Sequence, residues 1–157
     1  MPTDSVVHQL AIRAGNKLRD KHLMLATAES CTGGMIATAI TNISGSSGWF
    51  ERGFVTYSNQ AKSEMIGVPP ELIERHDAVS EPVARAMAEG ALSVTGIAGP
   101  GGGSELKPVG TVSFGWSNRL HTEVETLMFR GDREQIRVQA VTHALRGLLK
   151  LLDERER

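Results

Sequence analysis

The sequence predicts an α/β protein, a three-layer α/β/α sandwich around a mixed β-sheet. Three features predict it: helix-like and short strand-like segments alternate in the first half, two strand-like segments follow each other directly near the end, and a long amphipathic segment closes the chain. The 157 residues, 40% hydrophobic and 22% charged, have the composition of an ordinary globular protein. We therefore expect a single domain over residues 1–157.

The first element is an amphipathic helix that ends near Asp20, with Thr3 or Asp4 as its cap. Its apolar residues at three- and four-residue spacing are Val7, Leu10, Ala11, Ala14 and Leu18. Residues 23–28 form an apolar run too short for a buried helix, and we expect a buried strand there. A short helix over 35–41 and a loop over 43–48 should follow.

The β-branched and aromatic residues of 52–57 predict a second strand. Ser58 or Asn59 can cap a helix over 60–66, and Gly67 ends it before two prolines. Ser80 caps the next helix, with Pro82 in its first turn, and the apolar pattern continues to about Leu92.

Three more strands are expected at 94–98, 111–116 and 124–129. Asp132 and Gln135 have the spacing of a capping box, which starts the final helix. The buried side of that helix carries Ile136, Ala140, Leu145, Leu148, Leu149 and Leu152.

The join between the helix ending near Leu92 and the strand beginning near Val94 is unusually short. Only Ser93 lies between them, whereas such connections usually take about 2 to 6 residues. Either the helix ends earlier than its apolar pattern suggests, or a segment of the domain is missing here.

Charge and cysteine content exclude several classes. The formal net charge of −1, with 17 Lys and Arg against 18 Asp and Glu, argues against a nucleic-acid-binding protein. The single cysteine cannot form an internal disulfide, and no cluster has the spacing of zinc ligands. The N-terminus lacks the pattern of a signal peptide, and no segment is apolar enough to span a membrane. We expect a cytoplasmic protein without a metal or another cofactor.

The first candidate site is the segment from Ala28 to Gly34. A serine at the carboxyl end of a strand, here Ser30, points into the crevice where open α/β sheets bind ligands. The N–H groups that open the next helix can hold a phosphate or stabilise an oxyanion. The same pattern also fits a capping serine in a glycine-rich turn.

The second candidate is the segment from Tyr57 to Lys62, which follows the second strand. A lysine partly buried among apolar residues loses affinity for its proton and can act as general base to a serine, so a Ser-Lys pair is one interpretation and a solvated helix lysine the other. Cys31 competes with Ser30 as nucleophile, but no histidine is near it in sequence to form the thiolate.

The glycine-rich stretch 95–104 lets the backbone approach a ligand closely, although a mobile hairpin connection would look the same. Three arginines lie near the start of the last helix, Arg130, Arg133 and Arg137. Together with the helix polarity they could bind a phosphate, or they could form surface salt bridges.

Six motifs in order resemble the CinA C-terminal domain family, the family of nicotinamide-nucleotide amidases or NMN deamidases. They are ATAESCTGG at 26–34, GSSGWFERGFVTYSN at 45–59, AVSE at 78–81, TGIAGPGGGS at 95–104, KPVGTV at 107–112 and GDR at 131–133. The resemblance covers nearly the whole chain. It implies an α/β/α sandwich with a mixed sheet and members that pair as homodimers or higher homo-oligomers.

The resemblance also implies an activity, hydrolysis of the carboxamide of nicotinamide mononucleotide to nicotinate mononucleotide and ammonia, in pyridine nucleotide salvage. Ser30 resembles the nucleophile, Lys62 its general base, and Tyr57 a residue that orients or relays the proton. The residues implied to bind substrate are Cys31, Thr32, Gly33, Asn59, Thr95, Gly96, Gly99, Gly101, Gly102, Arg133 and Arg137.

Two departures from the family pattern stand out. The domain that many members carry in front of this one, similar to molybdopterin-binding proteins, is absent, so the chain resembles the stand-alone form. The family also has around ten more residues at the short join before Val94. A nucleotide-binding module of the same fold without turnover is the other function that these residues allow.

Overall fold

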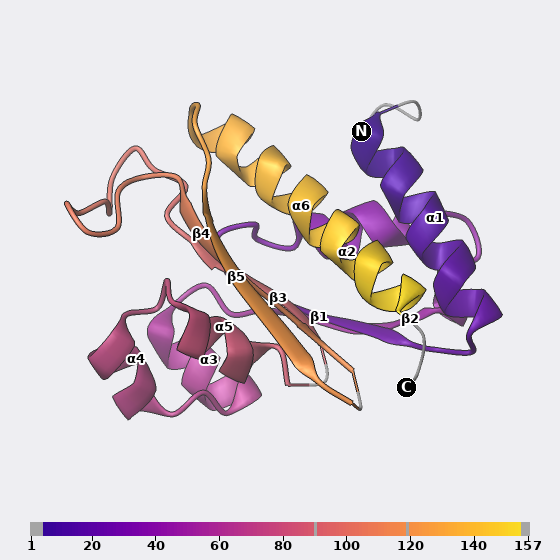
Figure 1. Cartoon of the computed structure of the whole chain (residues 1–157), viewed down its shortest axis with the longest axis horizontal. Helices are drawn as coiled ribbons and strands as arrows, with labels where there is room; N and C mark the ends of the chain where they lie inside the picture. Colours follow the sequence, from indigo (N-terminus) through magenta and orange to yellow (C-terminus); the bar gives the residue numbers. More distant parts are fainter. Residues whose placement is uncertain (1–4, 90, 119, 155–157) are drawn as a thin grey trace.

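The computed structural model describes residues 5–89, 91–118 and 120–154. In these residues one mixed sheet of five strands, in the order β2-β1-β3-β4-β5, separates two layers of helices. Figure 1 shows α1, α2 and α6 on one face and α3, α4 and α5 on the other. The predicted three-layer sandwich is confirmed. The strands are β1 (Leu25–Glu29), β2 (Phe50–Val55), β3 (Leu92–Gly96), β4 (Thr111–Ser117) and β5 (Thr122–Met128), and the helices are α1 (Val6–Asp20), α2 (Met35–Thr41), α3 (Asn59–Ile66), α4 (Pro70–His76), α5 (Glu81–Met87) and α6 (Arg133–Asp153).

The sheet changes character at β3. Strand β1 pairs in parallel with β2 and with β3, whereas β3, β4 and β5 form an antiparallel series. The carboxyl ends of β1, β2 and β3 therefore meet at one edge, and the segments that follow them open on the same side. In an open sheet this edge is the usual place for a ligand.

The larger core lies between the sheet and the layer of α1, α2 and α6. Helix α6 begins with the predicted capping box of Asp132 and Gln135, and its apolar side is buried as expected. Trp116 of β4 stacks on Phe114 and donates its indole N–H to the carbonyl of Ala144, at 2.9 Å. An aromatic ring with a satisfied polar atom thus joins α6 to the middle of the sheet.

A smaller core lies under the opposite layer, formed by Ala28, Val68, Ile73, Val83 and Met87. Helix α4 supplies Ile73, and the sequence interpretation missed this helix because its two prolines suggested a stop. Pro70 is the first residue of α4, where an N–H has no partner within the helix anyway.

The predicted extent of α5 is wrong, since the helix ends at Met87 rather than near Leu92. The strand that follows begins at Leu92, and the hydroxyl of Ser93 donates to the carbonyl of Ala84, at 2.7 Å. The first of the two alternatives, an earlier end of the helix, is therefore observed, while a missing segment before Val94 stays a prediction. Leu92, the last residue of the apolar pattern that suggested a longer helix, belongs to the strand instead.

The other elements differ from the prediction only near their ends. Strands β2 and β5 begin and end earlier than predicted, and a 3-10 turn, Ser46–Gly48, lies in the predicted loop. Ser5 caps α1, while the predicted caps Thr3 and Asp4 lie outside the described residues.

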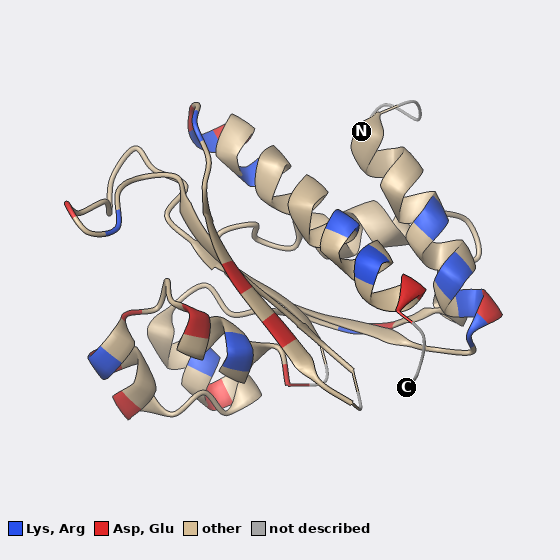
Figure 2. Cartoon of the chain, in the orientation of Figure 1, with Lys and Arg blue, Asp and Glu red and all other residues tan. Residues whose placement is uncertain are grey.

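Figure 2 shows acidic residues along β5 and both signs of charge on the helices. No helix in the described ranges is long and apolar enough to cross a bilayer.

Candidate active site

Three segments that follow parallel strands meet at one edge of the sheet. Ser30 follows β1 directly, Lys62 lies in α3, which follows β2, and Thr95 and Gly96 end β3. The backbone N–H of Ser30 donates to the carbonyl of Val94, at 2.9 Å, and so fixes the end of β1 against β3. Ser58 caps α3 by accepting from the N–H of Ala61, which sets the direction of the helix that carries Lys62.

Ser30 and Lys62 are in contact. The Nζ of Lys62 lies 3.1 Å from the Oγ of Ser30, although the two residues are far apart in sequence. Both atoms also lie 3.4 Å from the carbonyl oxygen of Tyr57. Ser30 is 6% exposed and Lys62 only 1%, so the pair is shielded from bulk water. A serine hydroxyl at hydrogen-bond distance from an amine meets the geometric requirement for general-base activation.

The surroundings of Lys62 favour its neutral amine. Burial lowers the pKa of Lys62 below its ordinary value, because the charged form loses its hydration. Within the described part of the chain no carboxylate forms an ion pair with Lys62 to offset this effect. A neutral amine has the free lone pair that a general base needs. The alternative of a solvated helix lysine does not fit this burial.

Tyr57 contributes to the pair through its backbone and not its ring. The phenol is 57% exposed, and its oxygen accepts from Nη2 of Arg133, at 2.8 Å. The carbonyl oxygen is the part of Tyr57 that faces Ser30 and Lys62. The phenol thus contacts Arg133 and not the pair in this structure, and a part for the Tyr57 side chain in orienting or relaying the proton stays a prediction.

Cys31 is buried beside Ser30 but is held as a thiol. Burial, only partly offset by the charge of Arg137, raises the pKa of Cys31 to about 12. At neutral pH almost no thiolate forms, and the thiolate is the nucleophilic form of cysteine. This favours Ser30 over Cys31 as the nucleophile.

Glu29 is an important residue that the sequence interpretation missed. Its side chain is 1% exposed, and its carboxylate accepts from the hydroxyl of Thr32 at 2.7 Å and from the N–H groups of Ile36 at 2.8 Å and Ala37 at 3.1 Å. A negative charge at the N-terminus of α2 is favourable. Its charge, placed at the end of a buried strand just before a glycine-rich turn, was the signal that could have revealed it.

Glu29 also changes which N–H groups are available to a ligand. We expected the N–H groups that open the helix to be free, and those of Ile36 and Ala37 are not, because Glu29 takes them. The backbone N–H groups of Cys31 and Thr32 donate to no other residue in the described part of the chain. These two directly follow Ser30 and, beside the N–H groups of the glycine loop, are candidates to stabilise an oxyanion.

The two arginines of α6 connect the walls of the site. Arg133 donates to the carbonyl of Gly99 at 2.7 Å as well as to Tyr57. Arg137 donates to the carbonyls of Cys31 and Thr32, at 3.0 and 3.2 Å. A Cβ on Gly33 would lie 2.9 Å from Nη2 of Arg137, so glycine leaves room for that guanidinium.

The other predicted substrate-binding residues lie around the same edge. Thr95 is buried, and its hydroxyl donates to the carbonyl of Ala78 at 3.0 Å. A Cβ on Gly96 would meet Cys31 Sγ at 3.1 Å, so the end of β3 needs glycine to approach the serine segment. Three other predicted residues are exposed: Asn59, Gly101 and Gly102. The side chain of Asn59 makes no hydrogen bond to the described residues.

A second group of polar residues gathers at the opposite edge of the sheet. His121, Glu123 and Glu154 place their ligand atoms within 4.8 Å of one another, and all three are exposed. Beside them a cavity of about 260 Å³ lies between β5 and α6, with Trp116 and His143 in its wall. None of the predicted site residues lines this cavity.

Comparisons with known proteins agree with this picture. The model of the CinA C-terminal domain family matches residues 7–152. The chain is 51% identical to the nicotinamide-nucleotide amidohydrolase PncC of Escherichia coli strain K12, over 93% of this chain and 94% of that protein. It is 49% identical to the protein of the same name in Pseudomonas putida, over 90% of this chain and 94% of that protein.

Solved structures support the same relationship. The crystal structure of the competence/damage inducible protein CihA from Agrobacterium tumefaciens is 41% identical and superposes with a TM-score of 0.93, covering 98% of this chain and 99% of that one. The crystal structure of the competence or damage-inducible protein from Enterobacter asburiae is 36% identical and has a TM-score of 0.90. The match covers 96% of this chain and 100% of that one. The family model, the identities and the fold agree, and the chain belongs to the CinA C-terminal domain family.

Proposed function

We propose that this protein is a nicotinamide-nucleotide amidohydrolase, which converts nicotinamide mononucleotide and water to nicotinate mononucleotide and ammonia in pyridine nucleotide salvage. The observation that carries the proposal is the buried contact of 3.1 Å between Lys62 Nζ and Ser30 Oγ. Relatives about half identical over nearly their whole length carry the name of this activity. The pair supplies the chemistry that such an activity needs.

In the proposed mechanism the neutral amine of Lys62 takes the proton of the Ser30 hydroxyl as Oγ attacks the carboxamide carbon. The tetrahedral intermediate collapses when the Lys62 ammonium gives that proton to the leaving nitrogen, and ammonia departs. Water then attacks the Ser30 ester. Lys62 accepts a proton from this water and returns it to Oγ, which releases the carboxylate product.

Two features of the site support this route. The free N–H groups of Cys31 and Thr32 can stabilise the negative charge that develops on the carboxamide oxygen. Arg133 uses Nη1 and Nη2 on the Gly99 carbonyl and the Tyr57 hydroxyl, and Arg137 uses Nε and Nη2 on two carbonyls. Nε of Arg133 and Nη1 of Arg137 remain for the substrate phosphate. Binding energy from the phosphate would align the distant carboxamide against Ser30.

The test is ammonia release from nicotinamide mononucleotide, with a chelator present, by the wild type, Ser30→Ala and Lys62→Ala. We expect turnover in the wild type and a loss of at least about a thousand-fold in both variants. Ser63→Ala is the matched control, because Ser63 is the neighbour of Lys62 in α3 and its hydroxyl makes no hydrogen bond to the described residues.

Other outcomes would change the proposal in defined ways. A wild type that binds the mononucleotide without hydrolysing it would leave the nucleotide-binding module as the function. Turnover that survives in Ser30→Ala would overturn the serine mechanism, and turnover that stops with chelator would show a need for metal.

Two further expectations accompany the proposed function. We infer that the protein works in the cytoplasm and that it forms homodimers or larger homo-oligomers. The single cysteine suits a reducing compartment. Sedimentation of the purified protein tests the second expectation, and a monomer at micromolar concentration would contradict it.

A further inference from the structure

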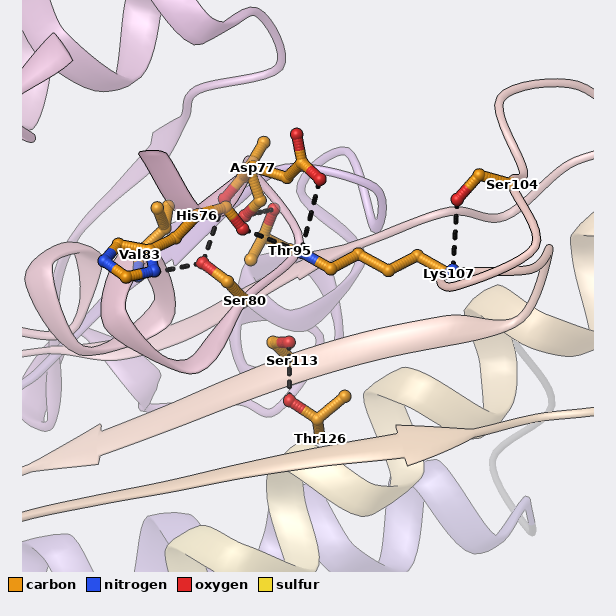
Figure 3. Close-up of polar contacts among 10 residues, drawn as sticks. His76, Asp77, Ser80, Val83, Thr95, Ser104, Lys107, Ser113 and Thr126 are labelled. Atoms are coloured by element: carbon orange, nitrogen blue, oxygen red, sulfur yellow. Dashed lines mark hydrogen bonds and ion pairs between the residues drawn. The ribbon is translucent and has the colours of Figure 1, made fainter. Parts of the chain in front are cut away.

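The glycine-rich segment between β3 and β4 is fixed at its far end by one lysine. Lys107 reaches across to the turn between α4 and α5, where its Nζ donates to the carbonyl of His76 at 2.7 Å and lies 3.5 Å from Oδ2 of Asp77 (Figure 3). The loop closes on itself beside this contact, because the N–H of Lys107 donates to the hydroxyl of Ser104, at 3.0 Å.

The turn that receives Lys107 is itself well defined. Asp77 has a φ of 65°, in the left-handed region that a non-glycine residue seldom adopts without a compensating contact. The hydroxyl of Ser80 donates to the carbonyl of Asp77 at 2.9 Å and caps α5 by accepting from the N–H of Val83 at 3.3 Å. The turn therefore offers its carbonyls in fixed positions.

The same turn is also connected to the catalytic edge. The carbonyl of Ala78 accepts from the hydroxyl of Thr95, and the neighbour of Thr95, Val94, accepts from the backbone N–H of Ser30. Lys107 and Thr95 thus bind to the turn two residues apart, one from the glycine loop and the other from the strand beside the nucleophile. Figure 3 shows both side chains directed at this turn.

The opposite end of the glycine loop is held separately, because the carbonyl of Gly99 accepts from Arg133. Between these two anchors the loop is exposed, with Leu106 94% accessible. Backbone hydrogen bonds of Ile97 with Gly110 and Thr111 also hold the base of the loop. Lys107 is the contact that ties its outer part to the turn between α4 and α5.

We propose that Lys107 is a positioning residue: by binding the turn between α4 and α5 it holds the glycine loop as a wall of the substrate site, at a fixed distance from Ser30. This inference rests on the proposed function for its substrate. It assigns a purpose to two motifs, AVSE at 78–81 and KPVGTV at 107–112, that the Ser-Lys mechanism does not use.

The test compares Lys107→Met and Lys107→Arg with the matched control Lys21→Met, at an exposed lysine of the α1 end. We expect Lys107→Met to raise KM for nicotinamide mononucleotide about tenfold, with a smaller change in kcat, and Lys107→Arg to restore most of the loss. Wild-type KM in Lys107→Met would overturn the proposal, and so would a loss confined to kcat.

A second readout does not depend on turnover. A protease that cuts after acidic residues should cleave at Glu105 several times faster in folded Lys107→Met than in the wild type, with equal rates for the two proteins in urea. Equal rates in the folded proteins would overturn the proposal even if the enzyme is active. Faster cleavage in a protein that hydrolyses no mononucleotide would support the anchor and refute only the proposed function.

If Lys107→Met unfolds, Asp77→Asn carries the same test, because it removes the ion pair and leaves the contact with His76. We then expect a smaller rise in KM and a smaller increase in the rate of cleavage at Glu105. Values equal to those of Lys21→Met in both assays would overturn the proposal.

Discussion

At the scale of single residues, Lys62 combines a functional requirement with a cost in stability. A lysine that is 1% exposed and has no carboxylate partner among the described residues loses the hydration of its charged form. Residues of this kind are retained for chemistry more readily than for folding.

We expect Lys62→Met to abolish ammonia release and at the same time to stabilise the fold by about 1 kcal/mol at neutral pH, because an apolar side chain of similar length avoids the cost of burying the amine. Thermal unfolding of the variant and the wild type measures the second effect. A variant that is less stable than the wild type would show that the hydrogen bonds of Lys62 outweigh its desolvation.

The pH dependence of the activity and of the stability of the fold follows from the lowered pKa of Lys62. The active form is the neutral amine, so kcat/KM should rise about tenfold per pH unit below this pKa and level off above it. Between the folded and the unfolded pKa the unfolded chain binds more protons, so the stability of the wild type increases with pH in this window. The stability advantage of Lys62→Met should therefore shrink as pH rises. A rate that falls with rising pH would contradict a general-base role.

The sequence could predict this chemistry only in part. A serine after one strand and a lysine after the next are visible in a linear pattern, because parallel strands bring both ends to one edge of the sheet. The direction of a side chain at the end of a strand is not visible, so the contact of the Tyr57 phenol with Arg133 could not be predicted. The charge of Glu29 at the end of a buried strand was a visible signal, but its partners, the N–H groups of Ile36 and Ala37, depend on how α2 folds back and could not be predicted.

At the scale of elements, α2 depends on Glu29. The helix begins after Gly34, which has a φ of 97° and no side chain to cap it, so the carboxylate from β1 replaces a local cap. This arrangement holds the start of the helix, and with it the turn that carries Ser30, against the sheet.

We expect Glu29→Gln to destabilise the protein by about 1 to 3 kcal/mol, because an amide offers one acceptor where the carboxylate offers two and turns an N–H₂ group toward other donors. It should also lower kcat, since the N–H groups of Cys31 and Thr32 would shift. Glu51→Gln on the exposed side of β2 is the control and should change neither property. A stable, fully active Glu29→Gln would show that the turn is held by its own backbone.

The ends of elements were the least predictable part of the fold. The helical spacing of Val83, Met87 and Leu92 runs past the end of α5 to the first residue of β3. Apolar spacing alone does not separate a helix from the strand that follows it. Tertiary contacts set the boundary between α5 and β3, because the hydroxyl of Ser93 donates to the carbonyl of Ala84. By contrast, a helix with a capping box, such as α6, carries its own start signal in the sequence.

At the scale of the whole molecule, close contact between α6 and the sheet sets the spacing of the layers. A Cβ on Gly147 would lie 2.3 Å from the Trp116 ring, so glycine lets the helix rest directly on the indole. We expect Gly147→Ala to destabilise the protein by about 1 to 3 kcal/mol through overpacking. Gly48→Ala is the control, because a Cβ there meets nothing within 4 Å.

Equilibrium unfolding in urea measures both substitutions, with tryptophan fluorescence as the signal. Trp49 and Trp116 are both buried in the layer that α6 covers, so the signal reports on this packing. A Gly147→Ala protein as stable as Gly48→Ala would mean that α6 can move outward without loss.

The change from parallel to antiparallel pairing at β3 has a consequence for engineering. The Ser30–Lys62 pair depends on the parallel strands and their crossovers, while β4 and β5 join through a short turn at the opposite edge of the sheet. A peptide tag or a reporter domain inserted in that turn would lie far from the reacting atoms. The hairpin between β4 and β5 is thus one position at which this scaffold can accept new sequence while its catalytic edge stays intact.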